Sequence, residues 1–172
     1  MPEKGWYFDT VSLSNFLFSG ADSLLKIRYY KRGFITWEVY DEICAGFIKY
    51  PSLQKLETLL SNEIFILVSL SDQARQLYSN LIAHLGKGEA SCIAAAKTSQ
   101  GIVVTDDRSA RQQCSHSYVP FTGTIGILKA AVMDGAINLS QADMYLGKMI
   151  KQGFYSPVRS ISEIIILSQK TF

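Results

Sequence analysis

The chain alternates between short apolar runs and longer segments in which apolar residues recur every three or four positions. The short runs are typical of buried parallel strands, and we expect strands at residues 5–9, 34–36, 64–68, 101–104 and 118–120. Run 64–68 is the clearest candidate for a buried strand. Pro120 suits an edge strand, because proline has no backbone N–H to donate.

Helical spacing covers most of the remaining chain. After a turn of hydroxyl residues at 10–14, a helix is expected to begin near Asn15 and to end at Gly20. Further helices are predicted over residues 21–30, 37–50, 52–60, 72–84, 89–99, 124–133, 140–151 and 160–169, with a short helix after Asp107. Pro51 is expected to stop the 37–50 helix, and Gly86 and Gly88 to break the chain before Glu89.

Strands that alternate with helices predict an α/β fold. The expected architecture is a three-layer α/β/α sandwich around a central parallel sheet of about five strands. A length of 172 residues fits a single domain over residues 1–172, in which residues 122–172 form a C-terminal helical extension.

Composition narrows the function classes only slightly. Hydrophobic residues make up 48% of the chain and charged residues 19%, which is enough for a real core and argues against disorder. A net charge of +2 neither requires nor excludes a nucleic-acid partner. The three cysteines form no metal-binding pattern and fit a reduced, cytoplasmic setting. No signal peptide and no membrane span are expected, since no apolar run approaches ~20 residues.

Acidic residues follow two of the predicted strands. Asp9 closes the first apolar run, Asp106 and Asp107 follow run 101–104, and Glu89 opens an alanine-rich helix. The carboxyl ends of strands in open α/β sheets are where such folds bind ligands. Clustered carboxylates are costly unless a cation neutralises them, so a hard divalent metal is the simplest candidate ligand.

Each of these acids also has a purely structural interpretation. Asp9 can cap the helix that follows it, and Glu89 is favoured by the positive end of its own helix. Asp106 and Asp107 are adjacent, so one can enter a site while the other caps the next helix. Glu42, with Glu38 and Asp41 beside it, can simply lie on a solvated acidic face.

Other chemistries lack their sequence signals. His84 and His116 have no partner at metal-ligand spacing, and there is no serine-hydrolase elbow, phosphate loop or dinucleotide fingerprint. Acids at strand ends without a nucleophile suit metal-assisted phosphoryl chemistry.

The acids lie in segments that resemble the motifs of PIN-domain proteins. The first is Phe8-Asp9-Thr10 with Leu13-Ser14-Asn15-Phe16, and the second is Val39-Tyr40-Asp41-Glu42-Ile43. The third is Gly86-Lys87-Gly88-Glu89-Ala90, and the fourth is Val104-Thr105-Asp106-Asp107-Arg108. The segment Thr122-Gly123-Thr124-Ile125-Gly126-Ile127-Leu128, with Gly153-Phe154-Tyr155-Ser156, resembles one prokaryotic branch of the family.

The resemblance implies a function and a set of roles. It implies RNA cleavage with Mg²⁺ or Mn²⁺, and often a toxin that pairs with an antitoxin protein and forms a homodimer. By position, the catalytic residues are Asp9, Glu42, Glu89 and Asp107, the metal ligands Asp9, Glu89, Asp106 and Asp107, and the RNA contacts Arg108, Arg111, Ser14 and Asn15. Many members have Asp where this chain has Glu89.

The leading hypothesis is therefore a metal-dependent endoribonuclease in which metal-activated water attacks an RNA phosphodiester. One alternative is a non-catalytic PIN-like scaffold that binds RNA or protein, which the glutamate at position 89 and the low net charge motivate. Another is an aspartyl-phosphate phosphatase with Asp9 as nucleophile, although Val11 stands where that class has a second aspartate.

Overall fold

The computed structural model describes residues 4–169, which contain a five-stranded, all-parallel sheet of order β3-β2-β1-β4-β5. The strands are β1 (Trp6–Phe8), β2 (Gly33–Thr36), β3 (Phe65–Val68), β4 (Ile102–Val104) and β5 (Phe121–Thr122). The central strand β1 pairs with both β2 and β4, and Trp6 lies opposite Gly33 on one side and Ile102 on the other. The predicted parallel sheet of about five strands is confirmed.

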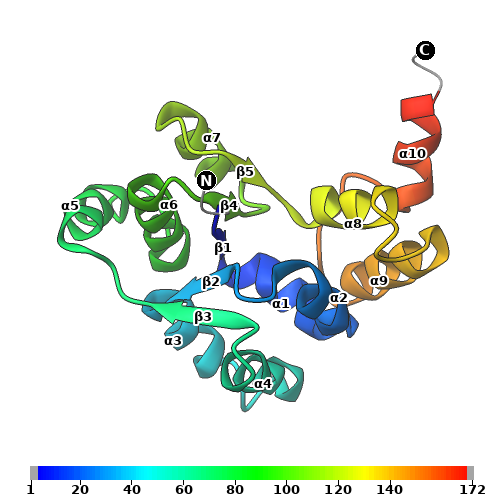
Figure 1. The fold of residues 1–172 in the computed structure, drawn as a ribbon, viewed down its shortest axis with the longest axis horizontal. Coiled ribbons are helices and arrows are strands. Elements are labelled where there is room, and N and C mark those ends of the chain that lie inside the picture. The colour runs from blue at the N-terminus through cyan, green and yellow to red at the C-terminus, as the bar shows by residue number, and fades with distance from the viewer. Residues whose placement is uncertain (1–3, 170–172) are drawn as a thin grey trace.

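Helices surround this sheet in the order that βαβ connections require. They are α1 (Thr10–Ser19), α2 (Asp22–Tyr29), α3 (Trp37–Ala45), the 3₁₀ helix η1 (Pro51–Gln54), α4 (Lys55–Ser61), α5 (Asp72–Leu81), α6 (Lys87–Ser99), α7 (Arg108–His116), α8 (Thr124–Met133), α9 (Leu139–Lys151) and α10 (Ile161–Gln169). In Figure 1, α5, α6 and α7 lie on one side of the sheet and α1 and α2 on the other, while α3 and α4 lie at the β3 end. The arrangement is the predicted three-layer sandwich.

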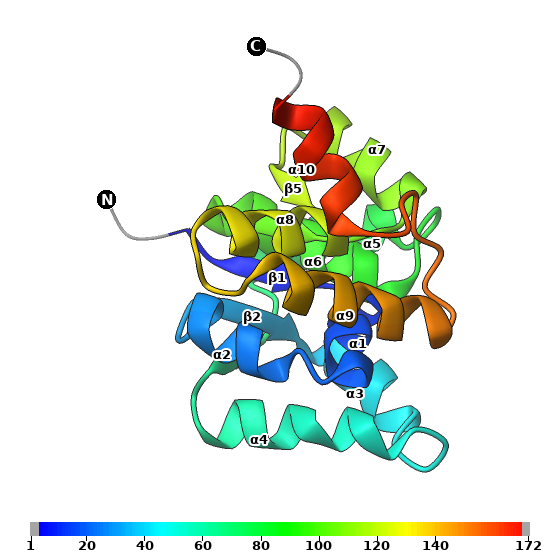
Figure 2. The ribbon, with the colours of Figure 1, turned by 90° about the vertical axis from the view of Figure 1, so that its right-hand side faces the viewer.

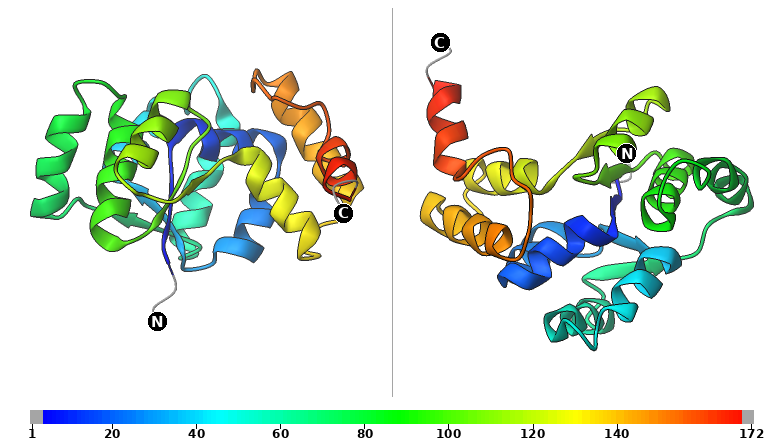
Figure 3. Two further views of the ribbon diagram at one scale, coloured as in Figure 1. Left: turned by 90° about the horizontal axis from the view of Figure 1, so that it is seen from above. Right: turned by 180° about the vertical axis from the view of Figure 1, so that it is seen from behind.

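The last three helices form a separate group beside α1. Helices α8, α9 and α10 pack on one another, and α9 also packs against α1. Figure 2 faces this group, and Figure 3 shows it from above and behind, at the far end of the molecule from α5. In the described part of the chain, no helix is long and apolar enough to cross a bilayer.

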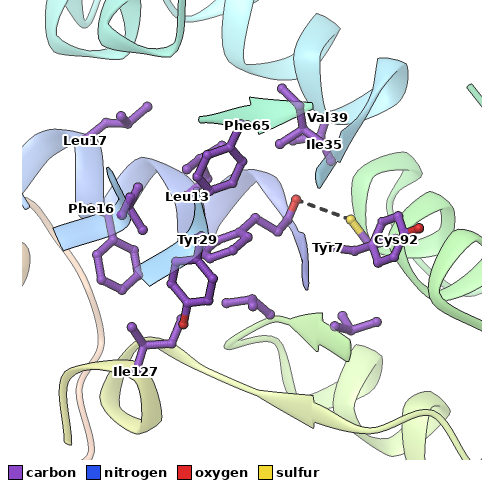
Figure 4. Packing of buried hydrophobic residues seen from close by; sticks show 14 of the residues in the cluster. Tyr7, Leu13, Phe16, Leu17, Tyr29, Ile35, Val39, Phe65, Cys92 and Ile127 are labelled. Carbon is purple, nitrogen blue, oxygen red and sulfur yellow. Dashed lines mark hydrogen bonds between the residues drawn. The ribbon is translucent and has the colours of Figure 1, made fainter. Parts of the chain in front are cut away.

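An aromatic cluster fixes the position of β1. Phe8 is fully buried, and the centroid of its ring lies 5.0 Å from those of both Tyr29 and Phe65 and 6.4 Å from that of Phe16. Figure 4 shows Phe16, Tyr29 and Phe65 converging from α1, α2 and β3. The backbone carbonyl of Phe8 also accepts a hydrogen bond from the thiol of Cys92 on α6, at 3.3 Å. Both faces of β1 are thus packed, and its last residue leads directly into Asp9.

Two strand predictions were wrong in detail. Strand β3 is an edge strand rather than a buried one, because β2 is its only neighbour, and Ile66 is 36% exposed. The last strand is Phe121–Thr122 and not residues 118–120. Tyr118 has a positive φ of 55°, so the chain turns there, and Pro120 contributes only its carbonyl, which accepts from the Val103 N–H at 2.9 Å.

Helix ends also differ from the predictions. Helix α1 begins at Thr10, because Asp9 itself caps it. The 37–50 helix ends at Ala45, and Gly46 follows where a Cβ would come within 2.8 Å of Leu53. Pro51 therefore opens η1 and does not stop a helix. Gly88 lies inside α6, whose N-cap is Gly86.

Candidate active site

Asp9 lies at the carboxyl end of β1 and is 1% exposed. Its Oδ1 accepts the N–H of Ser12 at 2.8 Å, which caps α1. Its Oδ2 is buried and finds no hydrogen-bond partner within residues 4–169. Burial raises the pKa of Asp9 to about 6, the neighbouring Thr105 side chain and Ser12 partly offset this rise, and the negative charge of Glu89 adds a smaller increase. One oxygen is thus used by the fold, and the other has no partner in it.

Glu42, on the second turn of α3, is held by the first turns of α1 and α6. Its Oε1 accepts the N–H of Gly88 at 3.1 Å, and its Oε2 accepts the hydroxyl of Thr10. A Cβ on Gly88 would lie 2.7 Å from Glu42 Oε2 and 2.9 Å from Thr10 Oγ1. A side chain at position 88 would therefore displace the Glu42 carboxylate or the Thr10 hydroxyl from their present contacts.

Glu89 is electrostatically coupled to the other acids. Burial raises its pKa, and the charges of Glu42 and Asp107 raise it further. Burial also raises the pKa of the Cys92 thiol, with smaller contributions from Asp9, Glu89 and Glu42. Asp9, Glu42 and Asp107 follow the parallel strands β1, β2 and β4, and Gly88 next to Glu89 contacts Glu42, so the four predicted catalytic acids lie at the carboxyl end of the sheet.

Asp106 and Asp107 divide their roles, as their adjacent positions allow. Asp107 is exposed and caps α7, with its Oδ1 accepting the Ala110 N–H at 2.7 Å. Asp106 turns toward α1 and α8: it accepts hydrogen bonds from the Ser12 hydroxyl at 3.3 Å, from the Thr124 N–H at 2.9 Å and from the Thr124 hydroxyl. Asp106 is thereby linked through Ser12 to Asp9.

Arg111 completes the contacts of Asp106. Its Nη2 lies 3.2 Å from Asp106 Oδ1, and its Nε donates to the Thr105 carbonyl at 2.9 Å. A Cβ on Gly123 would lie 1.9 Å from Arg111 Nη2 and 2.4 Å from Asp106 Oδ1, so a side chain there would displace the Asp106–Arg111 pair. The Gly123-Thr124 pair thus allows β5 and α8 to close over the Asp106 carboxylate.

The proposed RNA contacts differ in exposure. Arg108 is exposed on the first turn of α7, whereas Arg111 is held by Asp106. Ser14 donates its hydroxyl to the Thr10 carbonyl at 2.6 Å within α1. Asn15 is buried, and its amide donates to Thr124 Oγ1 at 3.4 Å. Of these side chains, Arg108 is the one that faces solvent without restraint from a described hydrogen bond.

Several residues of the site carried no clear sequence signal. Ser12, Thr10 and Thr124 hold the acids in place, but hydroxyl residues are common in turns and caps. The glycine pattern from Gly123 to Gly126 was the one signal that pointed at Thr124. Glu38, predicted to be solvated, is half-buried, and its Oε2 finds no hydrogen-bond partner in the described residues.

Replacing Thr124 by Val is expected to destabilise the protein by about 1–3 kcal/mol. The change keeps the shape of a fully buried side chain but removes the hydroxyl that Asp106 and Asn15 share. Urea denaturation monitored by circular dichroism measures the loss. Thr124→Ser, which retains the hydroxyl, is the control. Wild-type stability in Thr124→Val, with a loss in Thr124→Ser, would show that packing of the methyl group, and not the hydrogen bonds, stabilises this position.

Comparison with known protein families adds to this geometry. Residues 6–170 match the family model DUF3368, which describes a PIN domain. The chain belongs to the PIN-domain family. A comparison with curated proteins found none that matches it. The family match and the five-stranded parallel sheet together establish a PIN-like, nuclease-type fold.

The acids of this PIN domain suit a hard divalent cation by their chemistry. In residues 4–169, no three Asp, Glu, His or Cys side chains converge closely enough to enclose a metal ion. The donor set nevertheless consists of carboxylate oxygens, which Mg²⁺ and Mn²⁺ prefer. The buried Oδ2 of Asp9, without a partner among the described residues, is the observation that fits such a ligand best.

Proposed function

We propose that this PIN domain is a metal-dependent endoribonuclease that hydrolyses RNA phosphodiesters. The observation that carries the proposal is the Asp9 carboxylate, whose Oδ2 is buried without a partner in the described structure beside Glu89. A buried carboxylate of this kind is costly unless a cation or a proton neutralises it. Family membership supports the nuclease class of this activity.

Asp9, Glu89 and Asp107 would hold the Mg²⁺ or Mn²⁺, and Glu42 would bind it directly or through water. Bound there, the cation supplies activated water and stabilises charge that develops on the phosphate. The protein's own contribution is to fix the carboxylates. Thr10 and Gly88 hold Glu42, while Ser12 and Thr124 hold Asp106 close to Asp9.

The acids also explain why a cation is required for this substrate. The charges of Glu42 and Asp107 raise the pKa of Glu89, and an RNA phosphate would add a further negative charge. Arg111, which could offset this charge, is already paired with Asp106. A cation held by the carboxylates would offset this repulsion at the phosphate to be cleaved.

We further propose that the enzyme is a cytoplasmic toxin, with an antitoxin protein as its partner and a homodimer as its state. Support for this comes from the resemblance of the segment that includes Thr122–Leu128 to one prokaryotic branch of PIN proteins.

The test is cleavage of a mixed RNA pool in Mn²⁺, Mg²⁺ or EDTA by the wild type and by Asp9→Asn. We expect metal-dependent cleavage by the wild type and at least about a hundredfold less by the variant, because Asp9 Oδ2 is buried at the carboxyl end of β1 without a hydrogen-bond partner among the described residues. Asp72→Asn, an exposed acid on α5, is the matched control and should cleave normally. Unchanged cleavage by Asp9→Asn, or cleavage that persists in EDTA, would contradict the proposal.

A further inference from the structure

A pocket of about 360 Å³ opens beside the acids. Its walls come from β5, from the first turn of α8 and from the loop between α9 and α10, which passes the end of α8 in Figure 2. Phe121, Phe154 and Tyr155 supply the aromatic lining, and Asp106 with Arg111 supplies the polar end. Pockets of this size are typical of sites for small organic groups.

Two of the three aromatic side chains that line this pocket are exposed. Tyr155 is 95% exposed and Phe121 is 38% exposed. The guanidinium of Arg111, which is paired with Asp106, lies 5.9 Å from the centre of the Phe121 ring, so a cation–π contact borders the aromatic surface. Exposed aromatic rings beside an arginine are the groups on which proteins stack single-stranded bases.

The pocket is also linked to Asp9 through hydrogen bonds. Asp106 lines it and accepts the hydroxyl of Ser12, whose backbone N–H is bound by Asp9. Any group in the pocket is thus separated from Asp9 by two hydrogen-bonded residues. A nucleotide places a flat aromatic base and an anionic phosphate at a short, fixed separation, which matches an aromatic pocket next to a cation-dependent site.

We propose that this pocket binds one unstacked base of the RNA, with Tyr155 and Phe121 as its stacking surface. The proposal rests on the proposed function, because it takes the substrate to be RNA. It makes Tyr155 a residue that selects an unpaired nucleotide next to the bond to be cut. A base within a duplex is stacked and paired, and so cannot enter.

The test measures binding in EDTA, where metal-dependent cleavage does not interfere. The probe is a short single-stranded oligoribonucleotide that carries one 2-aminopurine, whose fluorescence falls when the base stacks on an aromatic ring. We expect quenching and binding with the wild type, and about 5- to 150-fold weaker binding with Tyr155→Ala, the range for loss of one base stack. Tyr155→Phe should retain most of the affinity, since it keeps the ring.

Tyr118→Ala is the matched control. Tyr118 is 90% exposed and does not line the pocket, so its loss should leave binding unchanged. The proposal would be overturned if Tyr155→Ala bound the RNA as tightly as the wild type, or if Tyr118→Ala weakened binding equally. A side chain of a protein partner would then be the remaining candidate ligand for the pocket. Absence of RNA binding by the wild type would overturn it as well.

The cleavage assay distinguishes failure of this proposal from failure of the proposed function. If the wild type cleaves RNA with metal and Tyr155→Ala binds RNA normally, only the base-binding pocket is refuted. If RNA binding depends on Tyr155 but the wild type cleaves no RNA, only the nuclease activity is refuted.

Discussion

Replacing Asp9 by Asn is expected to stabilise the metal-free protein by up to about 3 kcal/mol above pH 6, while it removes the cleavage activity. Asn is almost the same shape and is an equally good N-cap, so the hydrogen bond from the Ser12 N–H can be kept. What disappears is the cost of a charge on a carboxylate that is 1% exposed. A gain in stability with a loss of activity would mark Asp9 as a functional residue and not a structural one.

The effect has a defined pH dependence. Burial raises the pKa of Asp9 from 3.8 in the unfolded chain to about 6 in the folded protein. Between these values the folded state binds more protons than the unfolded state, so the free energy of unfolding falls as pH rises. Below pH 3.8 the carboxyl is protonated in both states, and the penalty is absent. The wild type and Asp9→Asn should therefore be similar near pH 3.5 and differ most above pH 6.

Urea denaturation in EDTA across this pH range measures the difference. Added Mn²⁺ should stabilise the wild type and not Asp9→Asn, because a ligand that binds only the folded state stabilises it. Asp72→Asn, whose carboxylate is exposed, should differ from the wild type by about 0.5 kcal/mol or less at every pH. An Asp9→Asn protein less stable than the wild type at pH 8 would show that both carboxylate oxygens serve the fold.

Much of the fold was predictable because its signals are local. The apolar run at residues 101–104 predicts strand β4, and helical spacing predicts the helix Thr124–Met133. The wrong assignments concern features that depend on neighbours. The apolar run 64–68 has the composition of a central strand, and only the strand order makes β3 an edge. The true end of the 37–50 helix at Ala45 reflects packing of Leu53 near Gly46, which no local pattern encodes.

The candidate site was predictable to the level of its acids. The sequence could place Asp9 and Asp107 at strand ends. Each of them also caps a helix, so the geometry is compatible with both a structural capping role and a role in a metal site. The sequence could not show that Asp106 bridges Ser12 and Thr124, residues far apart along the chain. Nor could it show that Arg111 is held by Asp106. In the sequence alone, a basic residue after an acidic motif fits a contact with an RNA phosphate as well as it fits an ion pair within the protein.

Replacing Phe8 by Ala is expected to destabilise the protein by about 3–5 kcal/mol. The side chain is fully buried, and three other rings, those of Phe16, Tyr29 and Phe65, pack around it, so its removal leaves a cavity that the strands cannot easily close. Small domains are stable by only about 5–15 kcal/mol, so this one change can consume a large part of the total. Urea denaturation of the two proteins at one pH measures the loss.

The consequence for the site is what makes this variant informative. Phe8 immediately precedes Asp9, and its carbonyl binds the Cys92 thiol on α6, the helix that carries Glu89. A cavity at Phe8 should therefore loosen the placement of both acids and lower cleavage even at temperatures where the protein stays folded. Phe8→Leu, which refills most of the space, should recover stability and cleavage together. Tyr118→Ala, an exposed aromatic, should change the free energy of unfolding by about 0.5 kcal/mol or less. If cleavage stayed normal in a folded but strongly destabilised Phe8→Ala protein, the acids would be positioned by their hydrogen bonds alone and not by the aromatic core beneath β1.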